Sequence, residues 1–382
     1  MRTATTEGTS EPVSNAVTAP ITVAEDDTST QLRRIWQELL GIESIGLDQN
    51  YFDLGGDSPM AVHLFAQIEK IFKVKLPLAI LFEAPTIEEL VRIVRRKASA
   101  FDWSPVVAIQ PDGTRPILFC VHGAGGNVLI YRELSQHLGC DQPFYGLQCQ
   151  GLGGQQPLLT KIEEMASLYV QEIQSVQPHG PYFLGGYCMG GTVAYEIAQQ
   201  LTARGEQVAL LAFFDTIDWS KLNLEGRWIQ YSYQIQRVWF HLRNFLLLNL
   251  KDQTKFFAEK WKVLRNRMVV WRGFLLSKLM KNEQVRSSES LHLAQIWKNN
   301  DHAANRYIPR PLNSFILDVR PLKQYSMFEG PDVHWDKLAM KGKEVITLPV
   351  YPAGMLVEPF VKHLAALLKR AIDCSIRGNA AS

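Results

Sequence analysis

Tyr182-Phe183-Leu184-Gly185-Gly186-Tyr187-Cys188-Met189-Gly190-Gly191-Thr192-Val193-Ala194-Tyr195-Glu196 is the stretch that decides the fold of this chain. Its apolar start predicts a buried strand, and the helical spacing of the later apolar residues predicts a helix. A sharp turn between the two would strain Cys188 and leave room only for glycine at Gly186 and Gly190. Such a turn holds the sulfur in front of the helix N-terminus, so we expect the helix dipole to favour its thiolate. Alternatively, the segment is a glycine-rich connection around a buried, unreactive cysteine.

The composition is that of an ordinary globular protein, with 46% hydrophobic and 20% charged residues in 382 positions. A formal net charge of +2 gives no reason to expect a nucleic-acid partner. The five cysteines are widely spaced and show no metal-ligand pattern, so no metal is expected. No segment resembles a secretion signal or is apolar over a length that spans a bilayer, which indicates a cytoplasmic protein with free thiols.

Changes in residue composition and apolar periodicity along the chain predict two domains with flanking segments. Residues 1–29 contain almost no large apolar side chains and are expected to form a disordered leader. A helical unit occupies 30–98, a linker with Pro105 and a Pro-Asp-Gly turn occupies 99–112, the larger domain occupies 113–372, and 373–382 form a tail.

The first domain has the pattern of a small four-helix bundle. Apolar residues from Leu32 to Leu40 share one helical face, and Thr86 with Glu89 forms a capping-box pattern ahead of the last helix. Between them stands Phe52-Asp53-Leu54-Gly55-Gly56-Asp57-Ser58, which places Ser58 at the start of a helix. A phosphate would be stabilised there by unpaired N–H groups, although the same serine could simply cap the helix.

This segment resembles the phosphopantetheine attachment motif of the peptidyl and acyl carrier proteins of nonribosomal peptide and polyketide synthases. The resemblance implies that Ser58 carries a covalent 4′-phosphopantetheine arm. It also implies two kinds of partner, upstream synthase modules and a phosphopantetheinyl transferase.

The larger domain alternates apolar strands with helices, which predicts a doubly wound, mainly parallel sheet. The Cys188 segment is similar to the G-x-S-x-G nucleophile elbow of the α/β-hydrolases, with cysteine in place of serine. Residues 113–372 as a whole resemble the type I thioesterase domains that terminate such synthases; Gly146-Leu147-Gln148 and the stretch from Gln177 to Tyr182 carry the likeness. The expected fold is therefore an α/β hydrolase with a helical lid, preceded by a four-helix-bundle carrier domain.

The resemblance implies roles for residues around Cys188, the nucleophile. The backbone N–H groups of Met189 and Ala124 would form the oxyanion hole. Asp215 ends the strand after the elbow helix and would be the acid, with Asp218 as the second choice. His122 precedes the Ala124 loop and is interpreted as structural.

The family's histidine is missing from its usual motif, because Pro352 stands where it belongs. Three hypotheses follow. Another histidine, His334 or His302, could supply the base. The enzyme could work without one, since a thiol needs a base less than a hydroxyl does, and release by an amine or by cyclisation would then be favoured over hydrolysis. Finally, the domain could bind without turnover.

The insertion at 219–300 corresponds to the family's helical lid. Its first part, 219–281, carries 13 Lys and Arg against 3 Asp and Glu, with five tryptophans. These residues could simply be lid core and solvated surface. Alternatively, the basic face binds the carrier phosphate while the aromatics shape an acyl tunnel, or the helix lies on a membrane surface.

The function expected from these features is the terminal release of a carrier-bound acyl or peptidyl chain. The chain would pass from the arm on Ser58 to Cys188, and then to an amine, a hydroxyl or water. The alternative is a catalytically degenerate hydrolase that acts as an acyl-binding or docking module.

Overall fold

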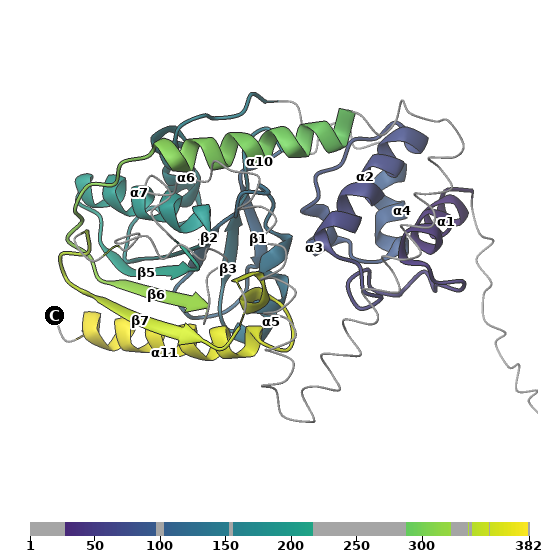
Figure 1. Cartoon of the computed structure of the whole chain (residues 1–382). Helices are drawn as coiled ribbons and strands as arrows, with labels where there is room; N and C mark the ends of the chain where they lie inside the picture. The colour runs from purple at the N-terminus through teal and green to yellow at the C-terminus, as the bar shows by residue number, and fades with distance from the viewer. Residues whose placement is uncertain are drawn as a thin grey trace, which may run out of the picture.

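The computed structural model describes residues 27–96, 103–152, 156–216, 288–321, 335, 338–350 and 352–380. In this described part, the larger domain is built on a seven-stranded sheet with the order β1-β3-β2-β4-β5-β6-β7 (Figure 1). Only the β1–β3 pair is antiparallel among these strand pairs. The predicted doubly wound, mainly parallel sheet is therefore confirmed.

The central strands of the sheet are formed by continuous apolar runs of the sequence. All four residues of β2 are buried, as expected for a parallel strand covered on both faces. The strands are β1 (Val106–Gln110), β2 (Leu118–Val121), β3 (Phe144–Leu147), β4 (Tyr182–Tyr187), β5 (Val208–Phe214), β6 (Ile316–Pro321) and β7 (Lys343–Leu348).

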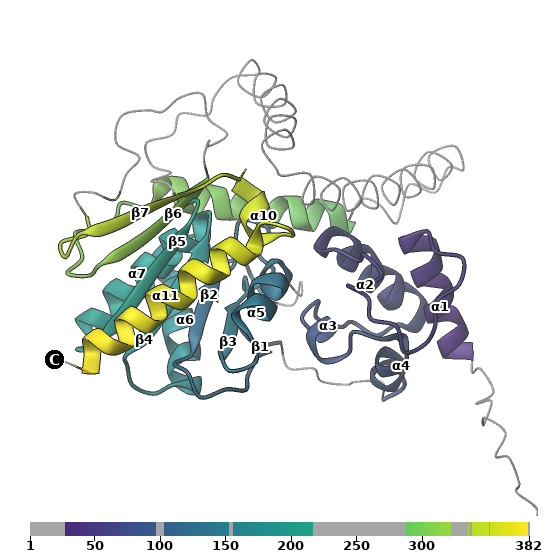
Figure 2. The same cartoon turned by 90° about the horizontal axis from the view of Figure 1, so that it is seen from below.

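Helices cover both faces of the sheet and form a three-layer domain (Figures 1 and 2). On one face, α6 (Ile162–Val176), α7 (Met189–Ala203) and α10 (Ser288–Arg306) share a core with the sheet. On the other, α5 (Arg132–Leu138) and α11 (Val361–Ala380) share a second core. Helices α6 and α11 each bury one apolar face against the domain core, whereas α7 is buried along nearly its whole circumference.

The predicted linker at 99–112 is wrong in its second half, because Val106–Gln110 form the edge strand β1. This strand pairs with β3, about forty positions further along the chain, with Val106 opposite Leu147. Five residues between two prolines carry too weak a local pattern to reveal a pairing made at that distance in sequence.

The predicted tail at 373–382 is also wrong, because α11 continues to Ala380. Ile372 is completely buried, and Asp373 forms an ion pair with Arg115 on the loop before β2. These tertiary contacts carry the helix past the point where its apolar sequence pattern weakens.

The N-terminal domain contains the four expected helices: α1 (Asp27–Leu40), α2 (Ser58–Phe72), α3 (Ile80–Glu83) and α4 (Ile87–Arg95). The capping box before α4 is confirmed, since the Thr86 side chain accepts a hydrogen bond from the Glu89 N–H and the Glu89 carboxylate accepts one from the Thr86 N–H. The structure corrects the boundary of the leader, because α1 begins at Asp27, inside the predicted 1–29. An acidic residue in the first turn stabilises a helix through its dipole, which supports this earlier start.

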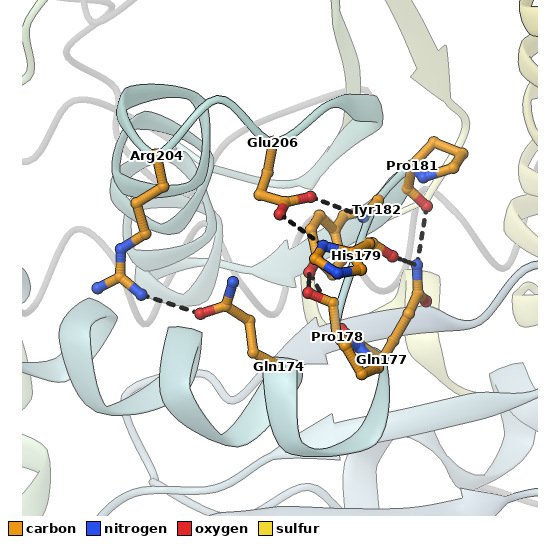
Figure 3. A network of polar contacts seen from close by, with 9 residues as sticks. Gln174, Gln177, Pro178, His179, Pro181, Tyr182, Arg204 and Glu206 are labelled. Atoms are coloured by element: carbon orange, nitrogen blue, oxygen red, sulfur yellow. Dashed lines mark hydrogen bonds and ion pairs between the residues drawn. The ribbon is translucent and has the colours of Figure 1, made fainter.

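A polar network holds the connection into β4 at the end of the strand opposite Cys188 (Figure 3). The Glu206 carboxylate accepts a hydrogen bond from the Gly180 N–H at 2.8 Å and contacts the His179 ring at 3.1 Å. The Tyr182 hydroxyl donates to the carbonyls of Gln177 and Pro178. These family-like residues thus anchor the start of the strand that carries the cysteine.

The predicted lid lies largely outside the described residues, which exclude 217–287; its last part, from Ser288, belongs to α10. Within the part of the chain that the structure describes, no helix combines the length and apolar character needed to cross a membrane.

Candidate active site

Cys188 occupies the predicted sharp turn between β4 and α7, with φ 57° and ψ −123°. The left-handed φ is strained for a residue with a side chain. The flanking glycines are needed for space: a Cβ on Gly186 would lie 2.2 Å from the Gly190 carbonyl carbon, and one on Gly190 would lie 2.4 Å from the Val121 carbonyl oxygen. A Cβ on Gly191 would lie 2.0 Å from the Thr216 hydroxyl oxygen. The elbow geometry expected from the sequence is therefore present.

Neighbouring strands hold this strained turn in place. The Cys188 N–H donates to the Phe214 carbonyl at 2.9 Å, and the Tyr187 N–H donates to the Tyr131 hydroxyl at 3.0 Å. The buried Tyr131 hydroxyl in turn donates to the Val121 carbonyl. Tyr131 therefore links the elbow to β2, a role that the sequence pattern did not indicate.

The structure corrects the expectation that Cys188 is a thiolate. Burial raises the pKa of the Cys188 thiol well above its ordinary value, and the carboxylates of Asp215 and Asp301 raise it further. The hydrogen bond from the Met189 N–H lowers the pKa but does not outweigh these effects. The resting Cys188 side chain is thus a neutral thiol, and a reaction in which it acted as a nucleophile would require an acceptor for its proton.

Asp215 directly follows β5, as predicted, and has a left-handed φ of 53°. Its N–H donates to the Val319 carbonyl at 2.9 Å, which fixes it to β6. Burial raises the pKa of Asp215 to about 8; the nearby Asp318 raises it and Arg320 lowers it. Asp318 is completely buried and accepts a hydrogen bond from Arg320 Nε at 2.8 Å. The sequence analysis missed this pair, although charged residues in an apolar strand were a visible signal.

Asp301 is a second carboxylate at the site, and the sequence analysis did not single it out. It lies on α10, where the Trp297 side chain donates a hydrogen bond to it. Burial raises the pKa of Asp301 to about 6. Asp301, Trp297 and His302 line a cavity of about 670 Å³ along α10.

The same turn of α10 packs on the glycine loop that follows β2. Asn300, completely buried, donates from its side-chain nitrogen to the Ala124 carbonyl at 3.0 Å. The Trp297 ring approaches Gly125, and Ile296 approaches Gly126. Helix α10 therefore positions the loop that contains the predicted oxyanion donor Ala124.

The histidines lie in different environments. His122 is buried between the Gly123 carbonyl at 2.6 Å and the Tyr169 hydroxyl at 2.9 Å, and burial lowers the pKa of its ring to about 4. It is a neutral histidine in the core. His302 is exposed on α10, whereas His334 and the alternative acid Asp218 lie outside the described residues.

The segment with the missing histidine forms the short helix η4 (Pro352–Leu356) after β7. Its Met355 and Leu356 side chains are completely buried in the core beside α11. The Met-Leu pair therefore anchors the segment through apolar packing.

In the N-terminal domain, Ser58 is the first residue of α2 and is partly exposed. The Asp57 side chain caps the helix by accepting a hydrogen bond from the Met60 N–H at 2.8 Å. Because a Cβ on Gly56 would lie 2.3 Å from the Tyr51 ring, the turn can pack against the core only with glycine there. An accessible hydroxyl at a helix N-terminus fits the attachment of a phosphate-linked arm.

The raised pKa of Asp215 predicts a pH-dependent stability. Its value in the folded chain, about 8, exceeds the ordinary 3.8, so ionisation is disfavoured by folding. The stability contributed by the protonated Asp215 side chain is therefore fully present below about pH 4 and is lost as the pH rises through about 8. We expect Asp215→Asn to raise the free energy of unfolding by about 1–2 kcal/mol at about pH 9 and by little at about pH 4. The value at pH 9 takes into account that the Asp215 side chain is partly exposed, since solvent weakens the electrostatic effect.

Urea unfolding of both proteins at the two pH values measures this difference. A loss of stability at the higher pH would contradict the prediction and would show that a cation stabilises the Asp215 carboxylate.

Comparisons with known families agree with this architecture. Residues 116–302 match the thioesterase domain family, and residues 30–94 match the phosphopantetheine attachment site family. The chain thus carries a phosphopantetheine-binding carrier domain followed by a thioesterase domain of the α/β-hydrolase fold. A covalently attached 4′-phosphopantetheine belongs to this carrier domain.

The curated relatives that this chain matches include much longer synthetases. Malpibaldin synthetase from Mortierella alpina is 42% identical over 197 residues, which are 51% of this chain and 4% of the synthetase. The dimodular nonribosomal peptide synthase of Bacillus subtilis (strain 168) is 39% identical over 181 residues, which are 47% of this chain and 8% of that protein. The chain therefore spans only a small part of these relatives.

Two solved structures show the same folds. A holo four-domain nonribosomal peptide synthetase bound to AMP and glycine aligns with 94% of this chain and 27% of its own, at 26% identity and a TM-score of 0.55. The NocB thioesterase domain aligns with 70% of this chain and 100% of its own, at 21% identity and a TM-score of 0.51.

Proposed function

We propose that this chain releases an acyl or peptidyl chain from its carrier domain at the end of a nonribosomal peptide or hybrid polyketide assembly line. The observation that carries the proposal is Cys188 at the apex of the elbow, in a thioesterase domain that directly follows a carrier domain. Upstream synthase modules would supply the chain, and a phosphopantetheinyl transferase would modify Ser58. When attached, the arm presents the acyl group as a thioester.

In the first step, Cys188 Sγ forms a bond to the acyl carbonyl carbon, and the bond from that carbon to the carrier sulfur breaks. The Met189 and Ala124 N–H groups stabilise the negative charge on the oxygen. The thiol proton moves to Asp215 in its ionised form, which is the minor form at neutral pH because the pKa of this carboxyl group is about 8, and then to the departing carrier sulfur. A carboxyl group whose pKa is near 8 exchanges protons readily near neutral pH, which supports this role.

In the second step, an amine, hydroxyl or water attacks the Cys188 thioester, and the sulfur leaves and regains its proton. An amine or an internal nucleophile needs less activation than water does. Aminolysis or cyclisation is therefore favoured over hydrolysis, unless His334 or His302 serves as a base.

A second candidate function is supported by the electrostatics of the site. A buried thiol whose pKa is raised further by the charges of Asp215 and Asp301, with Pro352 at the histidine position, is a poor nucleophile. On this hypothesis, the hydrolase half binds an acyl group or a partner without turnover.

Peptide-level mass spectrometry after loading with hexanoyl-phosphopantetheine tests both functions, with and without added amine. Hexanoyl on Cys188 that clears only with amine supports covalent aminolysis. Clearance in water supports hydrolysis assisted by another base, such as His334 or His302. A hexanoyl group that stays on the carrier while Cys188 remains unmodified overturns the proposal and favours the binding module.

Ser58→Ala is expected to abolish loading, because it removes the hydroxyl that forms the phosphodiester. The measured quantity is the mass increase of the intact chain after incubation with the transferase and hexanoyl-coenzyme A. Ser175→Ala is the matched control, since Ser175 is an exposed serine whose hydroxyl donates to the Glu172 carbonyl on α6. Loading of the Ser58→Ala protein would place the attachment site on another residue.

A further inference from the structure

The two domains contact each other through the turn that precedes Ser58. Arg132, at the start of α5, forms an ion pair with Asp53 at 3.3 Å. Its guanidinium group lies 4.4 Å from the centre of the Phe52 ring, a cation–π distance. The Arg132 side chain is only 14% exposed, whereas the Asp53 side chain is 72% exposed, so the ion pair lies at the rim of the interface and is open to water on the carrier side.

Apolar side chains cross the same boundary in both directions. Leu129 of the thioesterase domain is buried within the carrier core. Ala79 and Phe82 of the carrier pack against the core formed by α5, α11 and the sheet, and Phe82 also stacks on Phe52. The interface thus combines an apolar centre with a charged pair.

This interface is continuous with the active site. Arg132 follows Tyr131, whose hydroxyl binds the elbow at the Tyr187 N–H. Leu129 lies a few residues after the Ala124 loop. Cys188 and Asp215 follow β4 and β5, which run parallel to β2, so both lie at the same carboxyl edge of the sheet as the segment that leads from β2 to Leu129 and Arg132.

We propose that the carrier turn Phe52–Asp53 docks on Arg132 and Leu129 and that this contact directs the arm on Ser58 to Cys188 of the same chain. The proposal deepens the function proposed above and rests on it. The thioesterase would thereby favour its own carrier over acyl thioesters free in solution. Arginine suits this contact because its planar group stacks on an aromatic ring while it pairs with a carboxylate.

The test uses the full chain carrying on Ser58 a pantetheine analogue that ends in a chloroacetamide. Cys188 Sγ displaces chloride from this group, loses its proton to solvent and forms a stable thioether. The reaction requires delivery to Cys188 but no acyl transfer. The free chloroacetamide analogue, which bypasses docking, serves as the comparison.

We expect Arg132→Glu to slow cross-linking from Ser58 to Cys188 about tenfold and to change the rate with the free analogue less than twofold. Arg132→Lys keeps the charge without the planar stack and should give an intermediate rate. Combining Arg132→Glu with Asp53→Lys restores opposite charges and should recover much of the loss. Thermal unfolding of each variant checks that both domains remain folded.

An unchanged cross-linking rate in Arg132→Glu, or an equal loss with the free analogue, overturns the docking proposal. The release function has a separate readout, hexanoyl transfer in the wild-type chain. If cross-linking depends on Arg132 but no hexanoyl reaches Cys188, docking is supported and catalytic release is refuted.

Discussion

Replacing Cys188 by alanine should reduce acyl transfer from the carrier at least about 10³-fold, because the proposed reaction then lacks its nucleophile. The measurement is single-turnover loss of hexanoyl from the Ser58 peptide. The buried Cys120, whose thiol pKa is raised by burial, provides the matched control as Cys120→Ala. Transfer that persists in Cys188→Ala would show that a different group receives the acyl chain.

Cys188→Ser sharpens this result. A serine hydroxyl needs a base even more than a thiol does, so we expect a loss of about 10²-fold or more if no histidine acts there. Activity close to wild type would instead demonstrate an effective base, and would direct attention to His334 and His302.

Gly190→Ala should lower the free energy of unfolding by about 3 kcal/mol or more, which is the second large effect. The added Cβ would lie 2.4 Å from the Val121 carbonyl oxygen and 2.5 Å from the His122 carbonyl oxygen. Both are backbone atoms at the end of a central strand, so they cannot move aside as a flexible side chain would. The urea midpoint of the thioesterase domain measures this loss.

Gly378→Ala is the matched control for this substitution. A Cβ on Gly378 would meet no atom within 4 Å, and the residue lies in helix α11. Alanine should therefore be neutral there or stabilise the helix by up to about 1 kcal/mol. Equal urea midpoints for the two variants would contradict the steric explanation of the elbow glycines.

Local sequence patterns predicted most secondary structure because their causes are local. The run Val208–Phe214 is apolar along its whole length. Such a run is stabilised as a strand when both of its faces are buried in a parallel sheet, so the pattern can be recognised in the segment itself. The capping box at Thr86 is likewise formed between residues three positions apart. By contrast, β1 and the last turns of α11 depend on partners far along the chain, and the sequence analysis missed both.

The residues of the candidate site likewise divide into those that a local pattern indicated and those that come from distant parts of the chain. The sequence indicated Cys188 and Asp215 through their positions in a strand–turn–helix pattern and at a strand end, and their catalytic roles remain predictions. Asp301, Asp318 and Arg320 were missed, because they reach the site from α10 and β6, more than a hundred residues after the elbow.

The sequence by itself determined the two-domain order, the doubly wound sheet and the glycine-flanked turn at Cys188. These follow from the periodicity of apolar residues and from the steric demands of one tight turn. Only the tertiary structure decided the protonation of the thiol and the contact of Arg132 with the carrier. Both depend on which distant side chains come together away from water, because burial and nearby charges set a pKa and the packing of domains sets an interface.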